Sequence, residues 1–173
     1  GGVIGTLMSN YGLQNFFRNQ KIKFIRANVG DRYVKEKMQK ENFNLGGEQS
    51  GHIIFSDQAR TGDGILTGLH LLDCMKRSQI RLAELAQSSM RRFPQVLHSI
   101  ELKEQLGDQN TILQQAQPLI TAAESIFTQK GRVLVRPSGT EPILRIMVEG
   151  EIASEVRHVA NEVTKSIKQT LKL

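Results

Sequence analysis

The stretch GGVIGTLMSNYGLQNFFRNQKIKFIRA (residues 1–27) determines the expected fold class. Residues 1–7 are apolar enough for a short buried strand, and Ser9 or Asn10 can cap the helix that follows. Residues 22–27 are rich in β-branched and aromatic side chains, which is typical of a second strand. A strand, a helix and another strand in this order predict an α/β domain whose sheet is mostly parallel.

The same alternation continues along the chain. The pattern indicates a polar helix over about residues 31–40, a strand at 52–55 and two helices over about 64–75 and 82–90. We therefore expect a mixed, mostly parallel, three-layer α/β domain over residues 1–91. The domain ends near Pro94, because a proline disfavours a helical conformation at the residue before it.

Residues 92–173 show a different order of elements. Alternating apolar residues predict a half-exposed strand over 96–102, and Pro118 suits the first turn of a helix. Two further strands, at 131–135 and 143–148, precede a final helix whose apolar residues have helical spacing. The order βαββα predicts a small α+β domain.

The composition favours a folded protein with anionic partners. Of 173 residues, 39% are hydrophobic and 23% are charged, close to the average for globular domains. The net charge of +6 and the pI near 9.7 favour anionic ligands. A basic, non-catalytic nucleic-acid-binding module is the competing interpretation, but aromatic residues are only 5% of the chain and tryptophan is absent.

The sequence also limits location and metal chemistry. It shows neither a membrane-spanning stretch nor a secretory signal, so we expect a cytoplasmic protein. The single cysteine, Cys74, cannot form an internal disulfide, and its place on an apolar helix stripe predicts a buried structural thiol. The histidines His70, His98 and His158 lie on separate predicted elements, so no metal site is expected in this chain.

The loop at residues 136–142, RPSGTEP, is the densest polar stretch and directly follows an apolar strand. Arg136 offers a planar set of donors, and Ser138 and Thr140 offer hydroxyls. Gly139 allows backbone N–H groups to approach a ligand closely. These donors predict a phosphate site, and a rigid turn held by the two prolines is the alternative.

A second candidate site is the loop at residues 46–52, GGEQSGH. Glu48 and Ser50 carry oxygens that suit neighbouring sugar hydroxyls, and the flanking glycines let a loop present them. An ordinary glycine-rich turn before a strand is the alternative, which composition alone favours.

A third candidate lies at residues 29–32, between a predicted strand and a predicted helix. Asp31 and Arg32 place charge where α/β proteins usually bind ligands, although an Asp that caps its own helix explains the same pattern. The segment at 61–64, TGDG, has too few carboxylates for a Mg²⁺ site and is interpreted as a helix start.

Taken in order, residues 29–34, 47–52 and 136–142 resemble motifs in the third and fourth domains of the α-D-phosphohexomutase superfamily. The resemblance covers essentially the whole chain. It implies that residues 1–91 are a sugar-binding domain 3 and that residues 92–173 are a phosphate-binding domain 4. It also implies interconversion of glucosamine 6-phosphate and glucosamine 1-phosphate, on the route to UDP-N-acetylglucosamine and the bacterial cell wall. Specificity for mannose or glucose phosphates within the same superfamily is the alternative.

The resemblance assigns roles to the residues of the first domain. Glu48 and Ser50 would hold sugar hydroxyls, and His52 would support their loop. Asp31 and Arg32 stand where related sugar phosphomutases carry a histidine, so they are the candidates for acid/base support in this chain. No residue of the chain matches the catalytic serine of the family.

For the second domain, the resemblance assigns Arg136, Ser138, Gly139 and Thr140 to the phosphate that does not react. The family transfers phosphate through a phosphoserine in its first domain, with Mg²⁺ held by its second domain. A glucose or glucosamine 1,6-bisphosphate would serve as activator or intermediate. The expected partners are the phosphosugar, the N-terminal domains 1 and 2 and, as an option, a second copy in a homodimer. The chain is expected to be the C-terminal half of such an enzyme and to be inactive alone.

Overall fold

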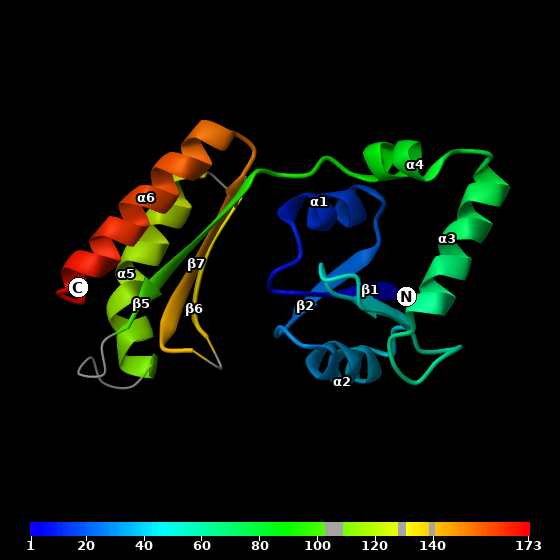
Figure 1. Cartoon of the computed structure of the whole chain (residues 1–173), viewed down its shortest axis with the longest axis horizontal. Helices are drawn as coiled ribbons and strands as arrows, with labels where there is room; N and C mark the ends of the chain where they lie inside the picture. The colour runs from blue at the N-terminus through cyan, green and yellow to red at the C-terminus, as the bar shows by residue number, and fades with distance from the viewer. Residues whose placement is uncertain (103–108, 128–130, 139–140) are drawn as a thin grey trace. The chain divides into compact units, whose positions relative to one another are not determined.

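A computed structural model describes residues 1–102, 109–127, 131–138 and 141–173 of the chain. The chain divides into two compact units, residues 1–92 and residues 93–173 (Figure 1). Each unit has its own sheet and its own hydrophobic core.

The sheet of the first unit is mixed and mostly parallel, as the sequence predicts. Its strands are β1 (Gly2–Thr6), β2 (Lys23–Ala27), β3 (Leu45–Gly47) and β4 (Ile53–Phe55), in the order β2-β1-β3-β4. Strand β1 pairs in parallel with β2 and β3, whereas β4 is antiparallel to β3. The sequence pattern does not reveal β3, because two of its three residues are glycines.

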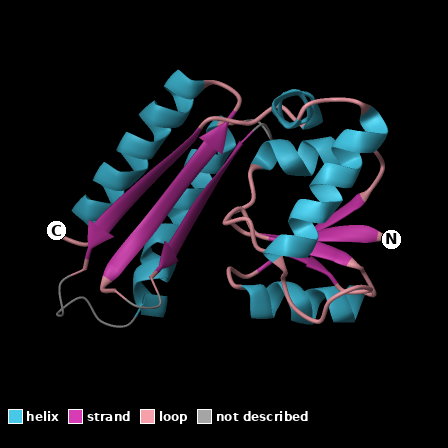
Figure 2. Cartoon of the chain, turned by 45° about the vertical axis from the view of Figure 1, so that its right-hand side comes forward, coloured by secondary structure: helices cyan, strands magenta, loops and turns pink. Residues whose placement is uncertain are grey.

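Two helices cover opposite faces of this sheet, which gives three layers (Figures 1 and 2). They are α1 (Tyr11–Asn19) and α2 (Asp31–Glu41). Asn10 caps α1, since its side chain accepts a hydrogen bond from the N–H of Gly12. The core consists of six buried apolar residues from the sheet, α2 and the segment after it: Ile4, Ala27, Val34, Met38, Phe43 and Ile54.

Two more helices, α3 (Gly64–Ser78) and α4 (Leu82–Ser89), complete the first unit. Asp63 caps α3 by accepting from two backbone N–H groups, which confirms the predicted helix start. The predicted burial of Cys74 is wrong, because the thiol is exposed. All residues of α3 are described and none is buried. The helix packs against α4 and touches the sheet through His70, whose ring stacks on Phe55 of β4, and its apolar stripe stays outside the core.

The second unit has the predicted βαββα order. Its elements are β5 (Gln95–Glu101), α5 (Gln109–Ile126), β6 (Gly131–Pro137), β7 (Ile143–Gly150) and α6 (Ala153–Thr170). The strands form an antiparallel sheet in the order β5-β7-β6, and both helices cover one face of it (Figure 1).

The expected position of Pro118 in the first turn of a helix is wrong. Pro118 lies inside α5, which begins at Gln109. An internal proline removes one backbone hydrogen bond from a helix. The helix continues because Ile112, Ala116 and Ile120 are buried in the core on both sides of that position, so tertiary packing outweighs the local cost.

Candidate functional site

The loops that follow β1, β2 and β3 meet at one edge of the first sheet, because these strands run parallel. Thr6 ends β1 and donates a hydrogen bond from its hydroxyl to the side chain of Gln49, at 3.3 Å. The Gln49 loop follows β3 directly. Ligands of open α/β sheets bind at this edge, beyond the carboxyl ends of the strands.

Glu48 joins two of the candidate motifs. The backbone N–H of Gly30 donates to Oε1 of Glu48 at 2.9 Å. Gly30 has a φ of +126° and directly precedes α2, so a residue with a side chain would strain this turn. The tertiary structure therefore brings the predicted sugar loop to the loop of Asp31.

His52 lies beside Asp31, with 3.9 Å between its Nε2 and a carboxylate oxygen. The Nε2 atom is buried and has no hydrogen-bond partner among the described residues. A buried polar atom without a partner is costly in a folded protein, and such an atom is typical of a place where a ligand or water completes the bonding. His52 thus presents a polar nitrogen that the protein itself leaves unused.

Gly62 is a site residue that the sequence interpretation missed. A Cβ atom at this position would lie 2.1 Å from Nε2 of His52. This distance is too short for a real contact, so any side chain at residue 62 would force the His52 ring to move. The loop at 61–64 therefore does more than start α3, since it forms the wall against which the imidazole rests. Only the tertiary contact reveals this role, because glycine before an N-cap is unremarkable in sequence.

We expect Gly62→Ala to displace the His52 ring and to destabilise the first unit by about 1–3 kcal/mol, the usual cost of overpacking. Nuclear magnetic resonance of the His52 ring and urea unfolding of the chain measure the two effects. Gly64→Ala is the matched control, because a Cβ there meets nothing within 4 Å. Unchanged His52 signals in Gly62→Ala would contradict the close contact.

The other two predicted residues of this region are on the surface. Ser50 is exposed, beside Gly51, whose φ of +91° makes a tight turn at the loop tip. Arg32 forms an ion pair with Glu36 one turn along α2, at 2.8 Å. This contact raises the pKa of Arg32 above its ordinary value. The described contacts therefore bring Asp31 toward His52, and they tie Arg32 to its own helix.

The predicted phosphate loop follows β6 in the second unit. Arg136 lies near the end of β6, and Ser138 is buried, with its backbone N–H donating to the carbonyl of Ile143 at 2.9 Å. Gly139 and Thr140 lie outside the described residues. The structure thus places two of the four predicted residues at the start of the β6–β7 connection.

Arg145 is a second cation at this site that the sequence interpretation missed. It pairs directly with Arg136 across β6 and β7, and both side chains leave the sheet on the face opposite the helices, since their neighbours Val135, Leu144 and Ile146 enter the core. Glu141 holds Arg145 through an ion pair of 2.9 Å. Strand alternation alone could have placed Arg145 on this face, but its register with Arg136 needed the sheet.

Two like charges side by side favour an anion between them. Burial of the Arg136 guanidinium lowers the pKa of Arg136 from its ordinary value, and the positive charge of the neighbouring Arg145 lowers it further. The Nε atoms of both arginines are buried and lack a hydrogen-bond partner among the described residues. A bound phosphate would supply acceptors to these donors and would neutralise the repulsion.

Comparison with known proteins finds two family models that match the chain. Residues 1–93 match the family model "Phosphoglucomutase/phosphomannomutase, alpha/beta/alpha domain III", and residues 79–166 match "Phosphoglucomutase/phosphomannomutase, C-terminal domain". The chain belongs to the phosphoglucomutase/phosphomannomutase family. The resemblance to the phosphohexomutases is confirmed for the fold and for both of its domains.

Members of this family include close relatives of the chain. A phosphoglucosamine mutase from Escherichia coli O7:K1 is 43% identical over 169 residues, and one from Pelagibacter ubique is 45% identical over 168 residues. Each alignment covers 97% of this chain and 37% of the relative. The chain therefore spans little more than a third of the length of the curated relatives it matches.

Solved structures show the same fold at low sequence identity. An Aspergillus fumigatus N-acetylphosphoglucosamine mutase superimposes with a TM-score of 0.81 at 21% identity, over 98% of this chain and 38% of that one. The same enzyme in complex with GlcNAc-6P and magnesium gives a TM-score of 0.74 at 19% identity, over 96% and 41% of the two chains.

No group of three or more His, Cys, Asp or Glu side chains that could hold a metal ion occurs among the described residues. None of the described helices has the length and apolar character of a membrane span.

Proposed function

We propose that this chain is the part of a phosphoglucosamine mutase that recognises the sugar and the non-reacting phosphate. The full-length enzyme would interconvert glucosamine 6-phosphate and glucosamine 1-phosphate through a phosphoserine. The observation that carries this proposal is the 43–45% identity to phosphoglucosamine mutases over 97% of the chain. Phosphomannomutase or phosphoglucomutase activity is the second candidate, since the family model includes both.

The first unit would bind the sugar. Glu48 and Ser50 would hold neighbouring hydroxyls, and the loop of Glu48 lies at the sheet edge where α/β proteins bind ligands. Glu48 accepts from Gly30 through one oxygen, which leaves its other oxygen for a hydroxyl. His52 and Asp31, 3.9 Å apart, would support the loop and any proton transfer at the sugar.

The second unit would hold the phosphate that does not react. Arg136 and Arg145 supply guanidinium donors, and Ser138 with Gly139 and Thr140 would supply hydroxyl and backbone donors. Such a mutase must bind its sugar in two orientations, so a fixed clamp for one phosphate positions the other for transfer. We propose that this clamp is the same in both directions of the reaction.

The phosphoryl-transfer residues would belong to other parts of the longer protein. The Mg²⁺ and the bisphosphate activator would then be bound with the help of those parts, because the described residues offer no metal-binding cluster. The apolar face of α3 supports such a partner. Ile65, Leu69 and Leu72 are 80%, 58% and 60% exposed, and a stripe of this kind is typical of a covered surface in the full protein.

We expect the 173-residue chain alone to show no mutase activity, because it carries the clamp without a phosphate donor. A coupled assay with glucosamine 6-phosphate and the bisphosphate activator measures the turnover. Isothermal titration with the same phosphosugar serves as the control, since the chain should still bind it. Turnover above that of a mock preparation would contradict the assignment of the chemistry to other domains.

In the full-length enzyme, we expect Glu48→Ala and Ser50→Ala each to lower kcat/KM by about tenfold or more, because an unpaired hydroxyl in a closed site costs ~1–3 kcal/mol. Ser50→Ala should leave the melting temperature unchanged, since Ser50 is exposed. Glu48→Ala should also loosen the loop at Gly30, which loses its acceptor. Steady-state kinetics test both variants, with exposed Ser56→Ala as the control. Wild-type kinetics in both variants would indicate that this loop is an ordinary turn and does not bind the sugar.

A further inference from the structure

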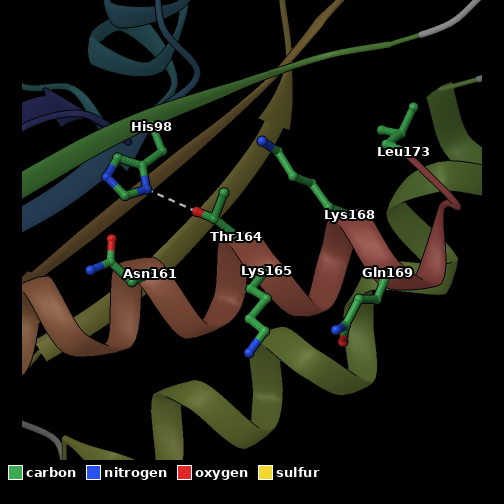
Figure 3. Close-up of a pocket in the computed structure, with 7 residues that line it drawn as sticks. All are labelled: His98, Asn161, Thr164, Lys165, Lys168, Gln169 and Leu173. Carbon is green, nitrogen blue, oxygen red and sulfur yellow. Dashed lines mark hydrogen bonds between the residues drawn. The ribbon is translucent and has the colours of Figure 1, made fainter.

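The second unit has a pocket that the proposed function does not use. It has a volume of about 300 Å³ and lies between the edge strand β5 and the outer side of α6 (Figure 3). A volume of this size suits a small molecule. Six polar residues and one leucine line it: His98, Asn161, Thr164, Lys165, Lys168, Gln169 and Leu173.

The polar character of the lining follows from the packing of α6. The helix turns Val156, Val159, Val163 and Ile167 into the core, so the side chains between them face outward. An exposed helix face usually carries charged side chains of both signs, which keep the protein soluble. The pocket lining contains lysines and no aspartate or glutamate.

His98 has a fixed orientation in this pocket. The hydroxyl of Thr164 donates its single proton to the carbonyl of Ala160 at 2.7 Å. The same oxygen lies 2.9 Å from Nδ1 of His98, and in the arrangement in which Thr164 donates to Ala160 it accepts from a proton on Nδ1. No described residue forms a hydrogen bond with the other ring nitrogen of His98, Nε2. Nε2 can accept from a phosphate hydroxyl or, when the ring is protonated, donate to a phosphate oxygen.

The lysines of the pocket have no acidic side chain beside them among the residues that line it. Neither Lys165 nor Lys168 forms an ion pair with a described carboxylate, whereas Lys23 and Lys37 elsewhere both pair with Glu41. Figure 3 shows Lys168 on the side of α6 that carries Thr164 and faces His98, while Lys165 extends from the other flank. Lys168 is therefore the main cation of the pocket, and Lys165 adds charge at its rim.

From these observations we propose that this pocket is a second anion site, which binds the phosphate group of a small molecule. Lys168 and Lys165 supply positive charge and His98 supplies a ring nitrogen, and a phosphate group carries enough oxygens and negative charge to bind more than one of these donors. Thr164 acts as a positioning residue for His98. The site is independent of the Arg136 loop, because its residues come from β5 and α6.

The test uses the full 173-residue chain with Arg136→Ala, so that the proposed clamp does not contribute. Inorganic phosphate is titrated at constant ionic strength while the ring signals of the histidines are followed by nuclear magnetic resonance. We expect saturable shifts of His98, with His158 on α6, which does not line the pocket, as the internal reference. A second titration uses glucosamine 6-phosphate in place of inorganic phosphate. Comparison of the two dissociation constants shows whether the pocket prefers a phosphate ester or free phosphate.

Variants separate a built site from general surface charge. We expect Lys168→Met to weaken phosphate binding by about fivefold and Lys165→Met by less, the range of exposed charged contacts. Lys172→Met is the control, because Lys172 is exposed and does not line the pocket. His98→Asn can keep a hydrogen bond to Thr164 but lacks Nε2, so it should weaken binding by about threefold.

Two results would overturn the proposal. One is that His98 does not respond to phosphate, or that Lys172→Met weakens binding as much as Lys168→Met, which would indicate an adventitious ion only. The other is that malonate binds as tightly as phosphate, which would contradict the assignment of this pocket to a phosphate group. Neither result depends on mutase activity, so the proposed function would stand in both cases.

Discussion

Arg136→Ala in the full-length enzyme should lower kcat/KM by about a hundredfold, equivalent to ~2–3 kcal/mol of transition-state stabilisation. The buried Nε of Arg136 lacks a partner among the described residues, and Arg145 lies directly opposite in the sheet. Both features indicate that the Arg136 guanidinium is positioned to bind an anion and that its main role is not to stabilise the fold. Because one clamp would serve both substrate orientations, the loss should be equal in the two directions of the reaction.

Arg136→Lys should lie between the wild type and Arg136→Ala, since an ammonium keeps the charge but not the planar pair of donors. Arg157→Ala, an exposed arginine on α6, is the control for loss of net charge. Initial rates with glucosamine 6-phosphate and with glucosamine 1-phosphate measure the effect. If Arg136→Ala keeps its kcat/KM and its affinity for phosphate ligands, the loop is a rigid turn and the clamp must lie elsewhere.

Glu149→Ala should cost the second unit about 3–5 kcal/mol of its free energy of unfolding, because it removes one member of a buried ion pair. Glu149 is 0% exposed, forms an ion pair with Arg132 on the neighbouring strand and accepts a hydrogen bond from Gln95 at 3.2 Å. The guanidinium of Arg132, only 15% exposed, would then lose its carboxylate. Urea unfolding and hydrogen exchange of the β7 amides measure this loss.

Glu141→Ala is the matched control for Glu149→Ala in the same unit. Glu141 also pairs with an arginine, Arg145, but 56% of its side chain is exposed. Exposed pairs contribute at most about 1 kcal/mol, so the two variants should differ clearly in stability. Equal losses in both variants would show that burial of the Glu149 pair adds nothing to the stability of the sheet.

The local sequence was sufficient for the fold class and for most of the elements. Strand and helix patterns alternate clearly up to residue 90, and the cap at Asp63 is a local signal that depends on neighbouring N–H groups alone. The three predicted strands and the final helix of the second unit were also correct. Such signals survive folding because hydrophobic periodicity and capping act over a few residues.

Where the prediction from sequence was wrong, packing between segments that are distant in the chain determined the structure. Strand β3 forms because Leu45 and Gly46 pair with β1, although a glycine pair has little strand propensity of its own. Pro118 stays helical because its neighbours are buried, and Cys74 is exposed because the apolar stripe of α3 lies outside the core. Local propensity is worth about 1 kcal/mol per residue or less for most residues, which burial of a few side chains exceeds.

The candidate motifs could be found in the sequence, the Arg136 loop by its dense set of donors and the Glu48 loop by the resemblance to the family. Their assembly was not visible. The hydrogen bond from Gly30 to Glu48, the ring of His52 against Gly62 and the register of Arg136 with Arg145 all join residues that strand pairing and loop closure bring together. The sequence alone determined which chemical groups this protein offers, and the tertiary structure decided which of them share a site, because contacts between distant segments depend on the whole sheet.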